Sequence, residues 1–595
     1  MIVCIVILSY FFRTFNLNWD AGIHLHPDER MLIMVAERIQ FFSQLNPDFF
    51  NYGTLPIYIL RGITTFLAKF PFTEVASTYD GMLIPGRYLS AFFDTLTILF
   101  IAKIAELLFR SNKTALFAAL VYGLMFFPIQ NSHFFIVDTF LTSFVTLTLL
   151  LLITFIRKPS ALFSILLAAS TAAALTSKIT AVIFLPIIGL GMFVGLCTTR
   201  PTTLRLSILT VTKQAVRLLG FFLLFSLSLL LFAFFFMPYA FLDHGQFLKE
   251  VVSQIRMNND AFVFPYTRQY VNTTPYWYYF KQIALWGAGP IATTLGLVGL
   301  VLVTKKMVGS IRDFGSVNFT KPYHIIRKLG QLKPYLPHII VALWYLVYIL
   351  IIGKSAVKFM RYMLPVYPAL ALVAGRALDW IWNMKPTRSV PGVKLRLGKL
   401  TVLILLVSLT IWTWMFTGVY RTDHSRVTAS IWIYEHIPQG NRLAVEHWDD
   451  HLPLPLDAKV KSKSQSVVGD TAVYHYQELP LFEPDTPQKW QQINTILKDS
   501  DYIIIASNRL YTPLARLTDC SKLPVLYCYR ETASYYHELF AGMRGFHQVA
   551  EFTSYPSLDF GVWKLTIPDD SADESFTVYD HPKVIIFQKD SFFAQ

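Results

Sequence analysis

About eleven long apolar stretches follow one another along the chain, and they constrain its fold more than any other feature. A helix needs about 20 predominantly apolar residues to cross the hydrocarbon core of a bilayer. The stretches lie at residues 1–12, 88–109, 115–130, 135–156, 161–176, 181–196, 218–237, 283–303, 339–353, 362–382 and 400–420. Charged residues make up only 15% of the 595 residues, whereas soluble chains carry about 25%. This pattern predicts an all-α membrane bundle of about eleven spans.

The first apolar stretch is shorter than the others. Its uninterrupted run covers only ~18 Å at about 1.5 Å per residue, and no basic residue precedes it. It also lacks the basic segment and the small-residue cleavage site of a signal peptide. We therefore expect the natural start of the chain to lie upstream.

The basic residues predict how the bundle is oriented, because Lys and Arg near span ends are retained on the cytoplasmic side. Alternate loops are basic, with Arg110, Lys113, Arg157, Lys158, Arg200, Arg205, Lys213, Arg217, Lys305, Lys306, Arg312, Lys321, Arg327, Lys328, Lys333, Lys385, Arg388, Lys394, Arg396 and Lys399. The N-terminus is therefore predicted inside and the C-terminus outside the cytoplasmic (plasma) membrane. The net charge of +14 then reflects topology and contact with membrane lipids, and we expect no nucleic-acid partner.

The composition changes after Tyr420, where polar and aromatic residues replace the apolar stretches. We expect a transmembrane domain over 1–420, with outward loops at 13–87 and 238–282, and an extracytoplasmic α/β domain over 421–595. The second part, about 175 residues long, suffices for one domain. Its sequence predicts a helix and three strands, at residues 429–436, 443–445, 502–506 and 584–587. Cys520 and Cys528 could form a disulfide if this domain is extracytoplasmic.

Four basic residues break the orientation rule, because they lie at the outward ends of spans: Lys178, Lys354, Lys358 and Arg361. The last three have a spacing that places them on one face if the segment is helical, where they could bind one anion. They could instead reach the phosphates of the outer leaflet as flexible side chains. Their concentration between Gly353 and Pro365 favours a specific phosphate site.

Two acids lie in apolar surroundings, where a charge costs ~2.5–3.5 kcal/mol at the bilayer centre and needs a partner or a cavity. Asp94 lies within a predicted span, and we expect it to pair with Arg87 or Lys178. Asp138 lies near the outward start of another span, where it could cap that helix or face a cavity. Both are expected to face the bundle interior.

The first outward loop contains the acidic segment His26-Pro27-Asp28-Glu29. Proline at the first helical position followed by two acids is typical of a helix start, so a structural interpretation is open. A chemical one is open too. Adjacent helical residues diverge by about 100°, so Asp28 and Glu29 cannot act on one atom as a glycosidase pair would. One carboxylate suffices if the leaving group is a phosphate, which needs cations to hold it and no general acid.

A divalent metal is an alternative use of this loop. His24, His26, Asp28 and Glu29 could hold one, with His133 as a further ligand, although their spacing matches no strong ligand pattern. We therefore expect no required cofactor. A second cluster, Glu446 to His451, could bind a sugar or a metal, or be a solvated loop.

Several motifs occur in an order and spacing that is specific when taken together. They are His26-Pro27-Asp28-Glu29, Tyr52-Gly53-Thr54-Leu55-Pro56, Gly86-Arg87-Tyr88-Leu89-Ser90, Ser132 to Thr139, Thr176-Ser177-Lys178 and Lys358 to Pro365. On these motifs, residues 13–420 resemble the GT-C glycosyltransferases. The resemblance is to the glycosyltransferase family 39 group, which contains protein O-mannosyltransferases and aminoarabinose transferases.

The resemblance implies an inverting transferase that takes a monosaccharide from a polyprenyl or dolichyl phosphate. It implies that Asp28, with Glu29 in support, acts as base or positions the acceptor. By position, Arg87, His133, Lys178 and Arg361 would line the donor cavity, and we add Lys354 and Lys358 for the phosphate and His26, Asp94 and Asp138 as lining residues. The acceptor, whether glycan, lipid or protein, stays open, because residues 421–595 do not resemble the repeat domain of eukaryotic protein mannosyltransferases.

Two other classes of function remain as alternatives. One is a transporter or flippase of lipid-linked sugars, although such proteins typically show repeated halves and discontinuous helices. The other is a non-catalytic membrane subunit that binds glycans through its outer domain. The aromatic residues between Phe262 and Tyr279 could form a membrane-surface belt or a wall of the acceptor site.

Overall fold

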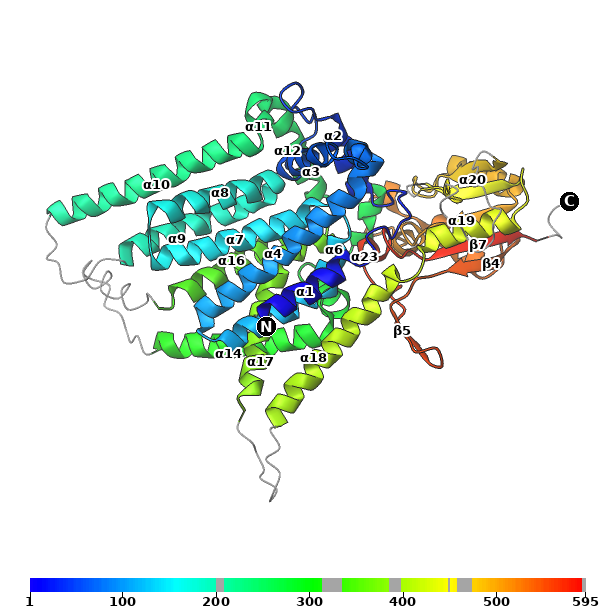
Figure 1. The fold of residues 1–595 in the computed structure, drawn as a ribbon. Helices are drawn as coiled ribbons and strands as arrows, with labels where there is room; N and C mark the ends of the chain where they lie inside the picture. The colour runs from blue at the N-terminus through cyan, green and yellow to red at the C-terminus, as the bar shows by residue number, and fades with distance from the viewer. Residues whose placement is uncertain (199–207, 313–333, 385–396, 448–449, 457–472, 591–595) are drawn as a thin grey trace, which may run out of the picture.

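The computed structural model describes residues 1–198, 208–312, 334–384, 397–447, 450–456 and 473–590. Figure 1 shows a bundle of long helices with a smaller α/β part at one end of it. Half of the predicted cytoplasmic basic residues lie outside the described residues, namely Arg200, Arg205, Lys321, Arg327, Lys328, Lys333, Lys385, Arg388, Lys394 and Arg396. The orientation of the bundle and the domain boundary at Tyr420 therefore stay predictions.

The bundle consists of long helices joined by short helical turns. The long helices are α1 (Ile2–Thr14), α4 (Leu83–Phe109), α5 (Asn112–Gly123), α7 (Val137–Arg157), α8 (Ala161–Ser177), α9 (Leu185–Thr198), α10 (Ile208–Phe236), α14 (Gly289–Arg312), α16 (Leu336–Ile352), α17 (Tyr367–Trp382) and α18 (Leu397–Phe416). The short elements among them are α6 (Phe126–Ser132), η3 (Ile179–Phe184), η5 (Ile283–Gly287), η6 (Met360–Val366) and η7 (Thr417–Tyr420).

Two excursions of the chain cover the end of the bundle that faces the α/β part. The first carries α2 (Pro27–Arg38), α3 (Leu55–Leu67), η1 (Glu74–Ser77) and η2 (Asp80–Met82), and the second carries α11 (Tyr239–Leu242), α12 (His244–Asn259), η4 (Pro265–Tyr270) and α13 (Trp277–Gln282). They correspond to the predicted loops 13–87 and 238–282.

Five helical stretches among the described residues are long and apolar enough to cross a membrane: Val137–Arg157, Ile179–Thr198, Thr212–Phe236, Gly289–Val308 and Leu397–His436. The bent pair α5 and α6 adds a sixth if it is one span, and α1, α3, α8 and α16 are shorter apolar helices. The chain is an integral membrane protein with a helical bundle, as predicted. The predicted number of about eleven spans is not confirmed.

Small residues let the helices approach closely, which is how helices associate where lipid removes the hydrophobic driving force. A Cβ atom at Gly375 of α17 would lie 2.5 Å from the backbone nitrogen of Ala118 in α5. Any larger residue at position 375 would therefore push these helices apart.

The buried acid of α4 has a partner that its sequence position did not indicate. The Asp94 carboxylate accepts hydrogen bonds from Arg13 Nε and the Tyr122 hydroxyl, each at 2.6 Å. Asp94 and Arg13 are fully buried. The prediction that Asp94 pairs with Arg87 or Lys178 is wrong, because α1 packs on α4 and places Arg13 beside it. Asp94 therefore neutralises a charge in the bundle and lines no described cavity.

The C-terminal part is built on a five-stranded mixed sheet of order β2-β1-β3-β7-β4. β1 (Arg442–Glu446) pairs in parallel with β2 (His475–Leu479) and β3 (Tyr502–Ile505), and β7 (Val584–Lys589) is antiparallel to β3 and β4 (Phe546–Phe552). The helical elements are α19 (Ser425–His436), α20 (Pro487–Asp499), α21 (Tyr511–Leu514), η9 (Val525–Tyr527), α22 (Arg530–Phe540) and α23 (Glu574–Thr577). The predicted α/β class, the helix and the three strands are confirmed.

A disulfide joins Cys520 and Cys528, which the sequence left open. A separate hairpin, β5 (Ser557–Asp559) and β6 (Lys564–Thr566), projects from the domain (Figure 1).

The segment around α23 joins the α/β part to the bundle. Phe576 is fully buried and its ring lies near Phe126, Trp286 and Phe416 of the bundle. Gln130 of α6 donates a hydrogen bond to the Phe576 carbonyl at 2.7 Å.

A charged cluster lies beside this contact. The Tyr420 hydroxyl donates to Asp580 at 2.6 Å, and His581 lies between Asp580 and Asp569. Burial lowers the pKa of His581, but the two carboxylates outweigh it and raise that pKa to about 10. The cluster therefore holds one positive charge between two negative ones across the junction.

Replacing Phe576 by alanine should loosen this junction. Removing a buried phenyl ring costs about 3–5 kcal/mol, so the Phe576→Ala protein should melt at a lower temperature and be cleaved faster between the two parts by a protease. Val525→Ala, at a side chain that is 89% exposed, is the matched control and should leave both unchanged. Equal cleavage of both variants would show that Phe576 does not hold the junction.

Candidate active site

A cavity of about 520 Å³ lies where the start of α2 meets the ends of several bundle helices and the α/β part. Its lining includes one carboxylate and two cations of the predicted site, Asp28, Lys178 and Arg361. Further lining side chains are Tyr52, Ile179, Ile255, Tyr266, Ile352, Phe359, Arg509, Glu574 and Tyr579. The cavity thus brings together residues from both halves of the chain.

Asp28 lies in the first turn of α2, which begins at Pro27 as the sequence predicts. Its carboxylate forms an ion pair with Arg361 Nη2 at 2.7 Å, and the side chain of Asp28 is 22% exposed. Burial raises the pKa of Asp28, but the Arg361 charge and a hydrogen bond from Tyr52 outweigh burial and leave that pKa below its usual value. Asp28 is therefore ionised at neutral pH and can accept a proton.

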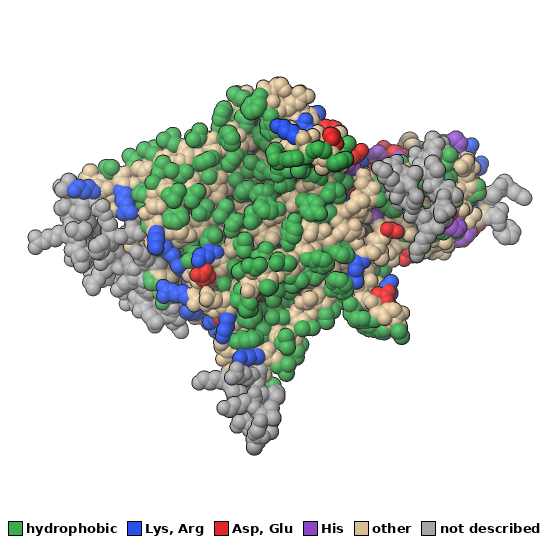
Figure 2. Space-filling view, viewed as in Figure 1, with side chains coloured by type: hydrophobic (Ala, Val, Ile, Leu, Met, Phe, Trp, Pro, Cys, Tyr) green, Lys and Arg blue, Asp and Glu red, His purple; other side chains and the backbone are tan. Residues whose placement is uncertain are grey.

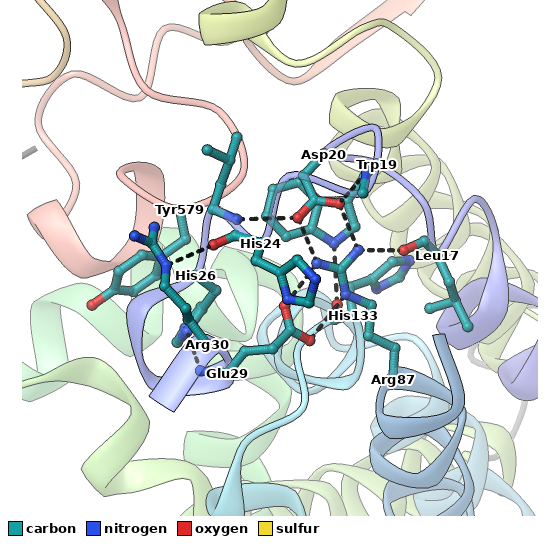
Figure 3. Close-up of polar contacts among 12 residues, drawn as sticks. Leu17, Trp19, Asp20, His24, His26, Glu29, Arg30, Arg87, His133 and Tyr579 are labelled. Atoms are coloured by element: carbon teal, nitrogen blue, oxygen red, sulfur yellow. Dashed lines mark hydrogen bonds and ion pairs between the residues drawn. The ribbon is translucent and has the colours of Figure 1, made fainter. Parts of the chain in front are cut away.

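Arg87 holds the first loop in place, as Figure 3 shows. Its Nε and Nη2 donate to Glu29 at 3.0 and 2.7 Å, and Nη1 and Nη2 donate to Asp20 at 3.0 and 2.8 Å. Nη1 also donates to the Leu17 carbonyl at 2.6 Å. These contacts use all five N–H donors of the guanidinium. The side chains of Arg87, Asp20 and Glu29 are fully buried.

The contacts therefore do not favour the phosphate-binding role predicted for Arg87 or a direct catalytic role for Glu29. Arg87 has no N–H left for a donor phosphate, and Glu29 does not face the cavity. Glu29 also accepts the backbone N–H of Phe135 at 2.8 Å, so it joins α2 to the start of α7. Because adjacent helical residues diverge by about 100°, the same turn points Glu29 into the bundle and Asp28 into the cavity.

His26 and His133 are structural, and the prediction that they line the cavity is wrong. His26 caps α2, its Nδ1 accepting the Glu29 backbone N–H at 3.4 Å, and its ring lies against Phe134 and Tyr579. Burial lowers the pKa of His26 to about 3, so the ring is neutral. His133 is buried and stacks on Tyr420 with 3.8 Å between ring centroids.

Lys178 lines the cavity and is held by Asp138. Its ammonium donates to the Asp138 carboxylate at 2.7 Å and lies 4.7 Å from the centre of the Tyr362 ring. The N-cap position of α7 is Ile136, with no capping side chain, so the capping role considered for Asp138 is wrong. Asp138 does not line the cavity itself and instead positions Lys178.

The loop that contains Tyr52 and Gly53 contacts the backbone next to Lys178. The backbone N–H of Gly53 donates to the Ser177 carbonyl at 3.0 Å, and a Cβ at Gly53 would lie 1.9 Å from the Thr176 oxygen. Only glycine permits this approach, which brings Tyr52 and Lys178 to one cavity.

Lys354 and Lys358 are not among the residues that line the cavity, so the structure does not support their predicted phosphate-binding role. The chain between Gly353 and Phe359 is not helical, and η6 begins only at Met360. The spacing of Lys354, Lys358 and Arg361 therefore does not place their side chains on one helical face. Lys354 is exposed, and the buried Lys358 ammonium donates to the Ala356 carbonyl at 3.0 Å.

The sequence did not indicate the contribution of the α/β part. Tyr579, which follows α23, lines the cavity, and its hydroxyl lies 3.5 Å from Arg361 Nη1. Arg509 and Glu574 line the cavity too and form an ion pair at 2.6 Å. Only Tyr52, within a motif noted in the sequence, carried a local signal.

A second cavity of about 330 Å³ lies between α2 and the α/β part. It shares Pro27, Met31, Arg509 and Tyr579 with the first cavity. Arg30 lines this second cavity and donates to the Asp450 carboxylate at 2.9 Å. The start of α2 therefore separates two adjoining cavities.

Among the described residues, no group of three or more His, Cys, Asp or Glu side chains could hold a metal ion. His24 stacks on Tyr79, at 4.2 Å between ring centroids. Of the cluster from Glu446 to His451, His447 and His451 contact Glu478, and Trp448 and Asp449 lie outside the described residues.

Part of the bundle matches the sequence model of a known protein family. Residues 78–227, from η2 into α10, match the sequence model of the family described as dolichyl-phosphate-mannose-protein mannosyltransferase. The resemblance to the GT-C glycosyltransferases is confirmed over this segment. No curated protein has significant sequence similarity to the chain.

The solved structures that are similar to the chain include AglB, ArnT and AftD. The archaeal oligosaccharyltransferase AglB from Archaeoglobus fulgidus, in complex with an inhibitory peptide and a dolichol-phosphate, has 10% identity and a TM-score of 0.47 over 99% of this chain and 88% of AglB. ArnT from Cupriavidus metallidurans, bound to undecaprenyl phosphate, has 12% identity and a TM-score of 0.41 over 86% and 94%. Arabinofuranosyltransferase AftD from Mycobacteria has 13% identity and a TM-score of 0.40 over 99% and 40%.

Replacing Arg87 by methionine should unfold the first loop. The change leaves Asp20 and Glu29 buried without their cation, and breaking a buried pair in this way costs about 3–5 kcal/mol. Arg38→Met, at an exposed arginine of α2, is the control. We expect a large fall in melting temperature for Arg87→Met only. Equal melting of the two variants would contradict the supporting role of Arg87.

Proposed function

We propose that the chain is an inverting glycosyltransferase. It moves a monosaccharide from a polyprenyl- or dolichyl-phosphate donor to an acceptor on the extracytoplasmic face of the membrane. The observation that carries this proposal is that the Asp28 carboxylate, Arg361 and Lys178 meet in one cavity at the helix ends. The family match over residues 78–227 supports it independently.

The reaction is a single displacement at the anomeric carbon. The acceptor hydroxyl oxygen forms the new bond to that carbon while the bond to the donor phosphate oxygen breaks. The lipid phosphate leaves with the bonding electron pair, and Asp28 takes the proton of the acceptor hydroxyl. Because the leaving phosphate is already a stable anion, no general acid is needed.

Two cations stabilise the leaving phosphate. Arg361 has five N–H donors, so it can hold Asp28 and still bind a phosphate oxygen. Lys178 lines the same cavity, and its hydrogen bond to Asp138 holds the ammonium in position. Positive groups placed in advance around a developing anion are the largest single contribution in many enzymes.

The apolar side chains of the cavity suit the lipid part of the donor. Ile179, Ile255, Ile352 and Phe359 line it beside the two cations. A polyprenyl chain could lie against them while its phosphate contacts Arg361 and Lys178. This arrangement supports a lipid-linked donor over a water-soluble sugar nucleotide.

The adjoining cavity offers a path for the acceptor. It opens between α2 and the α/β part and meets the first cavity at Pro27 and Tyr579. An acceptor entering there would reach Asp28 from the side opposite to the lipid. The α/β part would then contribute to acceptor binding, whether the acceptor is a glycan, a lipid or a protein.

The direct test is release of lipid phosphate from a radiolabelled polyprenyl-phosphate sugar by purified protein with an acceptor extract. Asp28→Asn should reduce turnover at least about 100-fold, the lower range for a general base. Glu37→Gln removes an exposed carboxylate of the same helix and should keep full activity. Transport of the intact donor without release, or full turnover by Asp28→Asn, would contradict the proposal.

The pH dependence of kcat/KM tests the pairing of Asp28 with Arg361. Because Arg361 holds the pKa of Asp28 below its usual value, activity should persist as the pH falls from neutral and decline only when Asp28 is protonated. Arg361→Gln removes that charge, so the pKa of Asp28 should rise. The decline of kcat/KM on the acid side of the pH profile, called the acid limb, should then move to higher pH.

The same variant should weaken donor binding. Losing a charge-assisted hydrogen bond of about 1.5–3 kcal/mol corresponds to a rise in donor KM of roughly 10- to 100-fold. Lys354→Gln, at an exposed lysine outside the cavity, should change neither KM nor the acid limb. If Arg361→Gln changed neither the acid limb of the pH profile nor the donor KM, Arg361 would have neither of the two proposed roles.

A further inference from the structure

The hairpin formed by β5 and β6 ends in an exposed apolar tip. The side chains of Phe560, Val562 and Trp563 are 65%, 101% and 55% exposed. Phe560 and Trp563 stack on each other, with 6.1 Å between ring centroids. Exposed apolar clusters of this kind mark a surface that another phase or molecule covers. The tip does not pack on the five-stranded sheet, from which the hairpin is separate.

The base of the hairpin is attached to the end of a membrane helix. Arg421 Nη2 donates to the Trp414 carbonyl of α18 at 3.0 Å and to the Ser557 carbonyl of β5 at 3.1 Å. The guanidinium also lies over the Trp414 ring, 4.6 Å from its centre. This three-part contact fixes the hairpin beside the end of α18 that faces the α/β part.

The neighbouring face of α18 is exposed and apolar. Leu403, Ile404, Val407 and Ile411 are between 43% and 57% exposed, and α18 lies in a stretch long and apolar enough to cross a membrane. This face therefore contacts lipid. Trp414 with Arg421 at its end has the composition of the aromatic and basic belts found where a span meets the headgroups.

The tip continues this lipid-facing surface. In Figure 1 the hairpin projects away from the sheet on the side of the molecule on which α18 lies. Figure 2 shows hydrophobic side chains over the projecting hairpin and over the adjoining surface of the bundle. Trp and Phe, followed by Lys564, suit the interfacial layer, where amphipathic rings lie among headgroups.

We propose that the tip of the hairpin, residues 560–563, inserts into the interfacial layer of the membrane leaflet next to the α/β part. The hairpin is then a second attachment of that part to the membrane, in addition to α18. This inference needs only the membrane location of α18 and does not depend on the glycosyltransferase proposal.

The attachment has a consequence for the cavity. Tyr579 and Glu574 reach the cavity from the α/β part, so the position of that part relative to the bilayer sets the shape of the cavity. An anchored hairpin would hold that part in place in addition to the junction at Phe576.

A spin label at Val562 tests the proposal in the full chain reconstituted in phosphatidylcholine and phosphatidylglycerol nanodiscs. Cys4 and Cys197, which are not in a disulfide, are first replaced by serine, and Val562→Cys is then labelled with a nitroxide. Collision rates with oxygen and with a water-soluble nickel complex give the depth of the label. Val407→Cys on the lipid-facing side of α18 and Gln492→Cys on the exposed surface of α20 are the two references.

We expect the Val562 label to be relaxed by oxygen more than by nickel, as at Val407, although at a shallower depth. Phe560→Ser with Trp563→Ser should shift it toward the values of the Gln492 label. A Val562 label as accessible to nickel as the Gln492 label would overturn the proposal. So would protection from both agents with spin–spin broadening between copies, because the tip would then lie in a contact between two protein molecules.

Discussion

The ion pairs of Arg87 with Asp20 and Glu29 are the interaction on which the site depends. One cation of α4 binds two carboxylates of the first loop, and all three side chains are fully buried. A buried charge group of this kind is stable only when every donor is used, and here the five N–H donors of Arg87 are. Glu29 also holds the start of α7 through Phe135. The helix α2 therefore has one orientation, and that orientation points Asp28 into the cavity beside Arg361.

The cavity belongs to both parts of the protein. The bundle provides Asp28, Lys178 and Arg361, and the α/β part provides Tyr579, carried by the segment that buries Phe576 among bundle aromatics. The charges in the cavity are arranged in pairs, Asp28 with Arg361 and Lys178 with Asp138. A bound phosphate would bring negative charge close to Arg361 and Lys178. Before the donor binds, the ion pairs with Asp28 and Asp138 hold these two cations in place. This is the physical sense in which the site is preorganised.

Local sequence signals predicted the features that depend on neighbouring residues. The Pro27 helix start and the strands near residues 443, 502 and 584 follow from composition and order. The order of the motifs also predicted that Asp28, Lys178 and Arg361 lie at the same end of the bundle. The features that failed depend on distant contacts. Asp94 binds Arg13 because α1 packs on α4. Tyr579 reaches the cavity because the segment around α23, which precedes β7, packs against the bundle. Lys358 was misassigned because a helical spacing was assumed for a segment that is irregular.

In the proposed reaction Arg361 and Lys178 bind the phosphate of a lipid-linked donor while Asp28 takes the proton of the acceptor hydroxyl. A structure of the full chain with polyprenyl phosphate bound tests it most directly. We predict density for the phosphate within hydrogen-bonding distance of the Arg361 guanidinium and the Lys178 ammonium, with the lipid chain along Ile255 and Ile352 and with the Arg87 ion pairs unchanged. Phosphate density at Lys354 and Lys358, or at Arg87 with its contacts to Asp20 and Glu29 broken, would contradict it.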